Sequence, residues 1–343
     1  MSASDTAVDP IRTPTGGSGG NPVAEIEALA GQILRARDHI GRVIFGQEET
    51  IEQTLVALLA GGHVLIVGVP GLGKTKLVDT LGAVMGLDNR RIQCTPDLMP
   101  ADILGSEVLD EDAAAARHFR FIPGPVFTQL LMADEINRAS PRTQSALLQA
   151  MQEREVTVAG ETHRLPRPFH VLATQNPIEQ EGTYPLPEAQ LDRFLLEIDI
   201  GFPDRDAERT ILLATTGAEE APPEPAMSPE DLIRAQQLLR RIPVGEQVVD
   251  AILTLVRSGR PEESDLPEVS RNVAWGPGPR ASQALMLACR ARALLQGRLS
   301  PSVDDVVALA GPVLRHRMAL NFAARAEGIT LADIVERLCA RIA

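Results

Sequence analysis

A glycine-rich loop between an apolar run and a helical pattern constrains the fold of this chain more than any other feature. The apolar run occupies residues 63–67, and the helical pattern begins directly after the loop. The loop fits the phosphate-binding spacing G-x-x-x-x-G-K-[ST]. Strand, loop and helix in that order predict a site for nucleotide phosphates, and they disfavour the alternative of a glycine-rich turn with an incidental lysine. The loop reads Gly68-Val69-Pro70-Gly71-Leu72-Gly73-Lys74-Thr75.

Each part of this loop has a physical role in holding phosphate. The glycines allow backbone N–H groups to curl around phosphate oxygens, and the start of the following helix adds positive potential. Lys74 would reach the β- and γ-phosphates, and Thr75 would ligate Mg²⁺. We therefore take the loop and the next residue as the candidate nucleotide-binding segment: Gly68, Val69, Pro70, Gly71, Leu72, Gly73, Lys74, Thr75 and Lys76.

Two adjacent carboxylates follow a later apolar run. The run 130–133 ends in Asp134 and Glu135, which would lie at the carboxyl edge of a parallel sheet, where α/β folds bind ligands. Asp134 would hold Mg²⁺ through its water shell, and Glu135 would orient and deprotonate the water that attacks the γ-phosphate. The pair predicts a hydrolase; the alternative is a solvated strand end or a helix cap.

An asparagine closes the next expected strand. Asn176 stands in the run Thr174-Gln175-Asn176-Pro177, where its amide could bond both the attacking water and the γ-phosphate. Asparagine before proline is also an ordinary turn starter. The residues alone leave both interpretations open.

The order of apolar and helical segments predicts a doubly wound, mostly parallel sheet of the P-loop NTPase kind, an α/β fold. Strands are expected at 63–67, 91–94, 130–133, 170–174 and 194–200. Two β-hairpins would be inserted, one pairing 107–109 with 119–121 and the other pairing 155–158 with 162–165. After residue 202 only amphipathic helical patterns remain. We expect a disordered tail over 1–22, a nucleotide-binding domain over 23–202 and a smaller all-helical domain over 203–343.

Charge and composition exclude several classes of protein. The chain has 33 basic and 46 acidic residues, a net charge of −13, and only 3% aromatic residues. Binding to nucleic acid through a basic surface with stacking aromatics is therefore not expected. The long uncharged run 55–73 is broken by glycines and a proline, so no membrane insertion is expected. Three cysteines without a CxxC pair fit a reducing cytoplasm.

Several longer runs resemble the AAA+ ATPases, and within them the MoxR group. The likeness covers roughly residues 42–340 and includes the stretches 133–138, 143–148 and 173–194, with 45–47 and 276–280. The resemblance implies that Asn176 is the sensor-1 residue. It also implies that Arg193 is an arginine finger completing the neighbouring subunit's site, and that Arg280 is the sensor-2 residue. Taken alone, Arg193 could pair with Asp192, and Arg280 could be a surface arginine bonded to a loop acid.

The resemblance extends to ligands and partners. It implies ATP and Mg²⁺ as cofactors, with Val43, Ile44, Phe45 and Gly46 lining the adenine pocket, although these apolar residues could equally be core. It implies a homo-oligomer, a hexameric ring, acting on a protein client such as a von Willebrand factor A domain protein, including roles in metal insertion into enzymes. The inserted hairpins resemble loops of magnesium chelatases and replicative helicases, so a nucleic-acid-translocating ATPase remains an alternative. A nucleotide-switched scaffold is a third.

Basic side chains on the hairpins could contact a threaded partner or could be solvated charges. They are Arg117, His118 and Arg120 in the first hairpin, and His163, Arg164 and Arg167 at the second.

Overall fold

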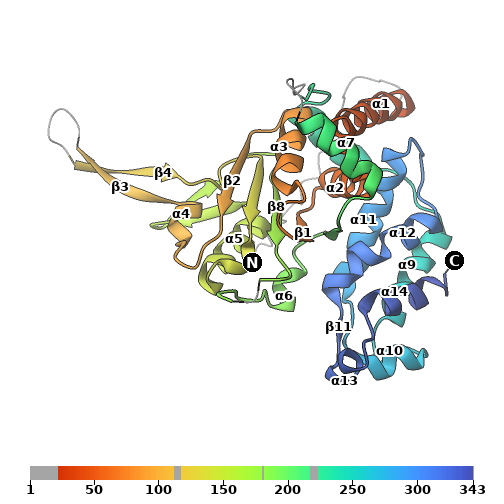
Figure 1. Cartoon of the computed structure of the whole chain (residues 1–343). Helices are drawn as coiled ribbons and strands as arrows, with labels where there is room; N and C mark the ends of the chain where they lie inside the picture. Colours follow the sequence, from red (N-terminus) through yellow and green to blue (C-terminus); the bar gives the residue numbers. More distant parts are fainter. Residues whose placement is uncertain (1–21, 112–116, 180, 217–222, 343) are drawn as a thin grey trace, which may run out of the picture.

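The computed structural model describes residues 22–111, 117–179, 181–216 and 223–342. The tail expected over 1–22 lies outside the described residues, apart from Pro22 at the start of the first helix. Figure 1 shows a sheet-containing unit, a helical unit beside it and a long hairpin that projects away from both.

A five-stranded parallel sheet forms the centre of the first unit. Its order is β2-β5-β8-β1-β9, and every pairing is parallel. This confirms the predicted fold class. The four strands β5, β8, β1 and β9 are largely apolar because helices cover both faces, whereas β2 is an edge strand and mostly polar and exposed. The bounds are β1 Val64–Gly68, β2 Asn89–Gln93, β5 Leu130–Asp134, β8 His170–Gln175 and β9 Leu196–Ile200.

Alternate residues of the central strands enter two separate cores. On β1, Val64 and Ile66 belong to one buried cluster and Leu65 to the other, as expected when successive side chains point to opposite faces. The larger cluster runs on into the C-terminal helices through Leu285 and Leu309. The helices and short turns around the sheet are α1 Pro22–Gly41, α2 Glu48–Ala60, α3 Lys74–Met85, α4 Pro100–Leu104, η1 Ile136–Arg138, α5 Pro141–Glu153 and α6 Glu188–Leu191.

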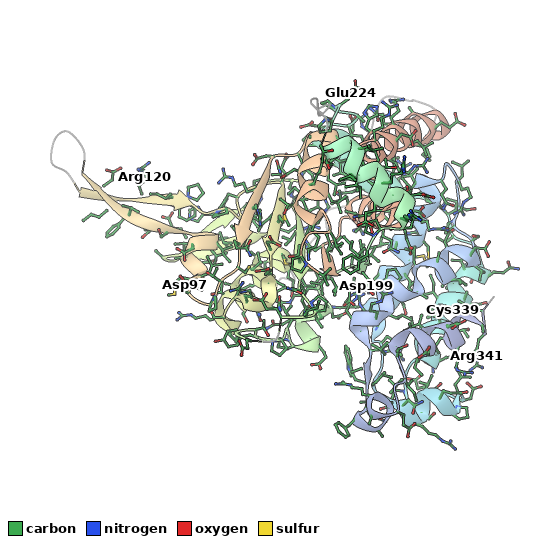
Figure 2. The ribbon with its side chains drawn as sticks, viewed as in Figure 1. Asp97, Arg120, Asp199, Glu224, Cys339 and Arg341 are labelled. Atoms are coloured by element: carbon green, nitrogen blue, oxygen red, sulfur yellow. The ribbon has the colours of Figure 1, made fainter. Side chains whose placement is uncertain are left out.

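Both predicted hairpins are confirmed. β3 (Gly105–Glu111) pairs antiparallel with β4 (Arg117–Pro123), and β6 (Glu155–Val158) with β7 (Glu161–Arg164). The first hairpin carries Arg120 on its projecting part (Figure 2), where Arg120 Nε lies 3.0 Å from a carboxylate oxygen of Asp110.

The two hairpins are joined by a ring contact that the sequence did not suggest. The ring of His163 stacks on Phe121, with centroids 4.0 Å apart and an interplanar angle of 10°. One face of the His163 ring is therefore covered by Phe121. The side chains of Arg117 and His118 lie outside the described residues.

The C-terminal unit is helical but not all-helical as predicted. β10 (Val273–Trp275) pairs antiparallel with β11 (Ala319–Leu320). Strands of two or three residues leave no alternating pattern in a sequence, because tertiary packing rather than local periodicity brings them together. The helices here are α7 Arg205–Thr215, α8 Pro229–Leu239, α9 Glu246–Ser258, α10 Pro267–Asn272, α11 Pro279–Leu295, α12 Val303–Leu314, η2 Arg315–Arg317, α13 Phe322–Ala326 and α14 Leu331–Cys339.

The turn η2 fastens the helical unit to the edge of the sheet. Arg317 is almost fully buried; its guanidinium donates to Asp192 at 2.7 Å and to the Phe194 carbonyl at 2.6 Å. Arg315 forms an ion pair with Asp199 on β9, and Asp199 lies between the two units in Figure 2. These contacts hold the helical unit against β9.

No helix in the described part of the chain is long and apolar enough to cross a membrane. The same residues contain no cluster of three or more His, Cys, Asp or Glu side chains suited to a metal ion.

Two buried histidines lie at the amino ends of β1 and β8. His63 Nδ1 accepts from the Val171 N–H at 3.0 Å, so its Nε2 carries the proton that Met151 O accepts at 3.2 Å. His170 Nδ1 donates to the Gly62 carbonyl at 2.8 Å, and its Nε2 accepts from Gln236 Nε2 at 3.2 Å. Each ring therefore fits its surroundings only when neutral, and burial lowers the pKa of His63 to about 3 and that of His170 to about 4.

These histidines should make the protein less stable as the pH falls below about 6.5. The histidines of the unfolded chain then bind protons that the buried, neutral rings of the folded chain do not. The free energy of unfolding therefore falls by about 1.4 kcal/mol per pH unit for each histidine. Buried His316, with a lowered pKa, adds to this. Glu197, whose pKa burial raises to about 7, acts in the opposite sense between about pH 4.5 and 7 and offsets about one histidine.

Urea unfolding measured from pH 7.5 to 5.0 checks this expectation. The free energy of unfolding should fall across the range. In His63→Gln the slope should be shallower by about 1.4 kcal/mol per pH unit, whatever the variant's stability at pH 7.5. An unchanged slope in that variant would show that His63 is protonated in the folded protein.

Candidate active site

The phosphate loop forms an open cradle of backbone. Gly71 and Gly73 have φ of +87° and +75°, the left-handed region that favours glycine, and a Cβ built on either would meet no atom within 4 Å. Gly73 is the N-cap of α3, so the helix's first N–H groups open into the same space. A concave set of free N–H groups at a helix N-terminus fits the oxygens of a nucleotide phosphate.

Lys74 brings the positive charge of the loop toward the acidic strand end. Its Nζ donates to the Gly68 carbonyl at 2.5 Å. Partial burial lowers the pKa of Lys74, while the charges of Asp134 and Glu135 act in the opposite direction. Thr75 follows as the second residue of α3 and is half-buried. The loop and the two carboxylates thus share one electrostatic site.

Asp134 is fixed at the end of β5 by two donors. Thr174 Oγ1 donates to one carboxylate oxygen at 2.5 Å, and Arg91 pairs with the other at 2.5 Å. Thr174 Oγ1 also accepts from the Glu135 N–H at 2.8 Å. This hydroxyl therefore sets the positions of both acidic residues. The carboxylate of Asp134 and the hydroxyl of Thr75 supply the oxygen ligands that Mg²⁺ prefers.

Glu135 has an uncommon backbone conformation for a non-glycine residue, with φ of 56°. One of its carboxylate oxygens accepts from Gln93 Nε2 at 2.8 Å and lies 3.2 Å from Arg138 Nη1. The side chain is thus aimed at β2 in this structure. Both donors lie on the same oxygen, Oε2, so Oε1 remains able to accept a proton from water.

Sequence reasoning missed the side chains that hold the acids. They are Arg91 and Gln93 on β2, Arg138 in η1 and Thr174 on β8. A signal was present for β2, because polar residues two apart at the end of an edge strand lie on one face. Register then brings Gln93 opposite Asp134.

Asn176 lies one residue beyond the end of β8 and is nearly buried. Its Oδ1 accepts from the Ile178 N–H at 3.2 Å, so the turn suggested by the Asn-Pro pair is present. Its Nδ2 donates to Glu179 at 3.4 Å, a long bond. β8 lies between β1 and β5, which places Asn176 between the phosphate loop and the acids.

An apolar cavity of about 240 Å³ adjoins the loop. Val43 and Ile44 line it, and Ile44 also belongs to the core. Gln47 donates its amide N–H to the Leu72 carbonyl at 3.0 Å, while its buried Oε1 has no partner among the described residues. Apolar walls with one unpartnered acceptor fit an amino-bearing base. Phe45, Gly71, Leu72, Gly73 and Lys76 line it as well, and three further lining residues were not suggested by the sequence: Pro203, Ile211 and Thr215.

Arg193 and Arg280 lie together, but away from the loop. Arg193 precedes β9, which runs parallel to β1, so it lies at the amino edge of the sheet, whereas the loop follows the carboxyl end of β1. Five-residue strands separate the two edges by roughly 16 Å. Both arginines line one cavity of about 510 Å³ with Arg154 and Arg317.

The carboxylate of Asp192 contacts two arginines of the helical unit, Arg280 and Arg317. Its carboxylate lies 3.6 Å from Arg280 and 2.7 Å from Arg317. The alternative of an ion pair between Arg280 and a loop acid is therefore met by Asp192. The alternative pair of Arg193 with Asp192 is not formed, and Arg193 has no ion pair within the described residues. The candidate site thus consists of two halves at opposite edges of one sheet.

Comparison with known proteins identifies the relatives of this arrangement. The sequence model of the ATPase family associated with various cellular activities (AAA) matches residues 63–196, and that of the AAA lid domain matches 268–338. The chain is 41% identical to Chaperone MoxR1 of Mycobacterium tuberculosis, over 96% of this chain and 85% of that protein. It is 32% identical to Protein MoxR of Paracoccus denitrificans, over 81% and 86% of the two chains. The crystal structure of a candidate ATPase from Cytophaga hutchinsonii superposes with a TM-score of 0.85 at 36% identity, covering 92% and 95% of the two chains.

Proposed function

This chain belongs to the MoxR-type AAA+ ATPases, and on that premise we propose that it forms a homo-oligomeric ring in which ATP hydrolysis remodels, activates or matures a protein client. The observation that carries the proposal is the division of the site. Lys74, Asp134 and Glu135 lie at one edge of the sheet, and Arg193 and Arg280 lie at the other. Neither half can reach the other within one chain, so a neighbouring copy must supply the arginines.

The first half binds and positions ATP. The loop N–H groups and Lys74 hold the phosphates, and the cavity beside Val43 and Ile44 takes the base. Mg²⁺, held by Thr75 and by Asp134 through water, would neutralise charge on the phosphates. Asn176 orients the attacking water, and Glu135 accepts its proton on Oε1 while Gln93 and Arg138 hold Oε2.

The second half completes the neighbour's site. Arg193 has no ion pair in the described chain, so its charge is available to a γ-phosphate presented by the next subunit. Arg280 lines the same cavity and acts beside it. A trans-acting arginine is expected to contribute about 10³–10⁵ to turnover, or roughly 4–7 kcal/mol of barrier.

The two units provide a route from hydrolysis to a client. We propose that residues 23–202 act as the nucleotide-binding domain and 203–343 as the lid, with a hexamer as the ring. The turn η2 joins the lid to β9 and, through Asp192, lies near Arg280. ATP binding and hydrolysis would rotate the lid against the sheet domain and move the inserted hairpins. The proposed clients include von Willebrand factor A domain proteins and enzymes that receive a metal, in the cytoplasm.

Capture of the client tests this proposal. Full-length protein carrying Glu135→Gln should elute as a larger species with Mg·ATP than without nucleotide, and should retain client proteins that the Lys74→Ala chain does not. Retention of nucleic acid instead, with hydrolysis stimulated by single strands, would support a translocase. Full cellular activity of Glu135→Gln beside inactive Lys74→Ala would support a nucleotide-switched scaffold.

A further inference from the structure

We propose that Arg154, Arg167 and Arg240 form a binding site for a doubly charged phosphate group, distinct from the phosphate loop. The three arginines line one cavity of about 190 Å³. Its wall also contains His170, the first residue of β8, and Gly61, which precedes β1. The cavity therefore lies at the amino edge of the sheet, opposite the loop.

Separate elements bring the three side chains to this cavity. Arg154 ends α5 and donates to the Gly61 carbonyl at 3.3 Å. Arg167 lies in the segment before β8, and Gln129 donates to its carbonyl at 3.0 Å. Arg240 follows the last turn of α8. Three guanidinium groups from three elements thus converge on one concave surface.

No carboxylate neutralises this cluster. None of the lining residues is acidic, and none of the three arginines forms an ion pair within the described ranges. Partial burial and the charges of Arg167 and Arg240 lower the pKa of Arg154. The chain as a whole has 46 acidic residues against 33 basic ones, so an unneutralised arginine cluster is unusual for it. Such a cluster repels itself unless an anion is present.

Helix dipoles account for only part of the charge balance. Arg154 and Arg240 lie at the C-terminal ends of α5 and α8, where each helix contributes about −0.5 of a charge. Three guanidinium groups against two such termini leave about two positive charges. A phosphate group carries about −1.5 to −2 at pH 7, which matches that excess.

The size and chemistry of the cavity also favour a phosphate group. Guanidinium groups bind phosphate oxygens through paired N–H donors. Neutral His170 has its Nε2 within 3.2 Å of Gln236, so the ring adds no charge. A volume of about 190 Å³ is below the roughly 300–1,000 Å³ of sites for larger ligands. Inorganic phosphate or the phosphate of a small monoester satisfies these conditions.

Calorimetric titration with inorganic phosphate tests the site. The full chain carrying Lys74→Ala is used, so that the loop's lysine contributes nothing. We expect one binding event, weakened about tenfold or more by adding either Arg167→Gln or Arg240→Gln, and unchanged by Arg241→Gln. Arg241 is an exposed arginine next to Arg240 that does not line the cavity. Far-UV circular dichroism and the melting temperature establish that each variant is folded.

Phosphoserine distinguishes free phosphate from a phosphomonoester as the ligand, and acetate distinguishes a phosphate group from a carboxylate. Phosphoserine binding as tightly as inorganic phosphate would support the site and indicate a phosphomonoester, while preference for inorganic phosphate would support it and indicate the free ion. Acetate should bind more weakly than either because it has one charge. Equal affinity for acetate, absence of phosphate binding, or equal weakening by all three arginine substitutions would overturn the proposal.

Discussion

Replacing Glu135 with Gln should leave ATP binding intact and lower turnover by about 10²–10⁴-fold. The substitution keeps the size of the side chain and can still bond its neighbours, but an amide cannot accept the proton of the attacking water. The cradle around Gly71 and Gly73 and the Lys74 amine are untouched. Binding of a fluorescent ATP analogue and steady-state phosphate release measure the two properties separately.

The control for this variant is an acid outside the site. Glu327→Gln changes an exposed carboxylate that follows α13 in the helical unit, and it should have wild-type binding and turnover. Unchanged hydrolysis in Glu135→Gln would remove Glu135 from its role as the base. Loss of ATP binding together with turnover would indicate a structural role at the end of β5.

Replacing Arg193 with Ala should lower turnover by about 10³–10⁵-fold while ATP binding is retained. The reason is position: Arg193 precedes β9 at the amino edge of the sheet and is separated from its own phosphate loop by the length of a strand. Arg193 also forms no ion pair in the described chain, so its removal leaves no carboxylate without a partner. Phosphate release and nucleotide binding, measured at one protein concentration, check both parts.

An exposed arginine supplies the comparison for that prediction. Arg241→Ala, at the end of α8 and outside the arginine cavity, should hydrolyse ATP at the wild-type rate. If Arg193→Ala also hydrolyses at the wild-type rate, the second half of the site has no part in the reaction. If Arg193→Ala loses affinity for nucleotide instead, Arg193 acts through its own chain.

The nucleotide half of the site could be predicted from sequence because its signals are local. The loop from Gly68 to Thr75 has a fixed spacing, and Asp134 directly follows an apolar run. Parallel strands then bring their carboxyl ends to one edge of the sheet without further information. The order β2-β5-β8-β1-β9 could not be predicted from the alternation, since it depends on which strands pair across long distances in the chain.

The arginine half could not be assembled from the residues alone. Arg193 and Arg280 belong to different units, and they share a cavity because Arg317 and Asp192 fix the helical unit against β9. Arginine is rarely buried unless paired, so nothing in the sequence distinguishes buried Arg317 from half-buried Arg315 two residues before it. The contact of Gln93 with Glu135 depends on the pairing of β2 with β5, whereas Arg138 lies only three residues from Glu135 and was a local signal that sequence reasoning passed over.

Mixing two inactive variants tests the central claim that each active site lies between two subunits. The Lys74→Ala chain retains its arginines, and the Arg193→Ala chain retains its phosphate loop. In mixed rings of equal composition, about one quarter of the interfaces join an intact loop to an intact arginine. We predict that the mixture recovers about a quarter of wild-type turnover, whereas activity no higher than the average of the two separate variants would contradict a site shared between subunits.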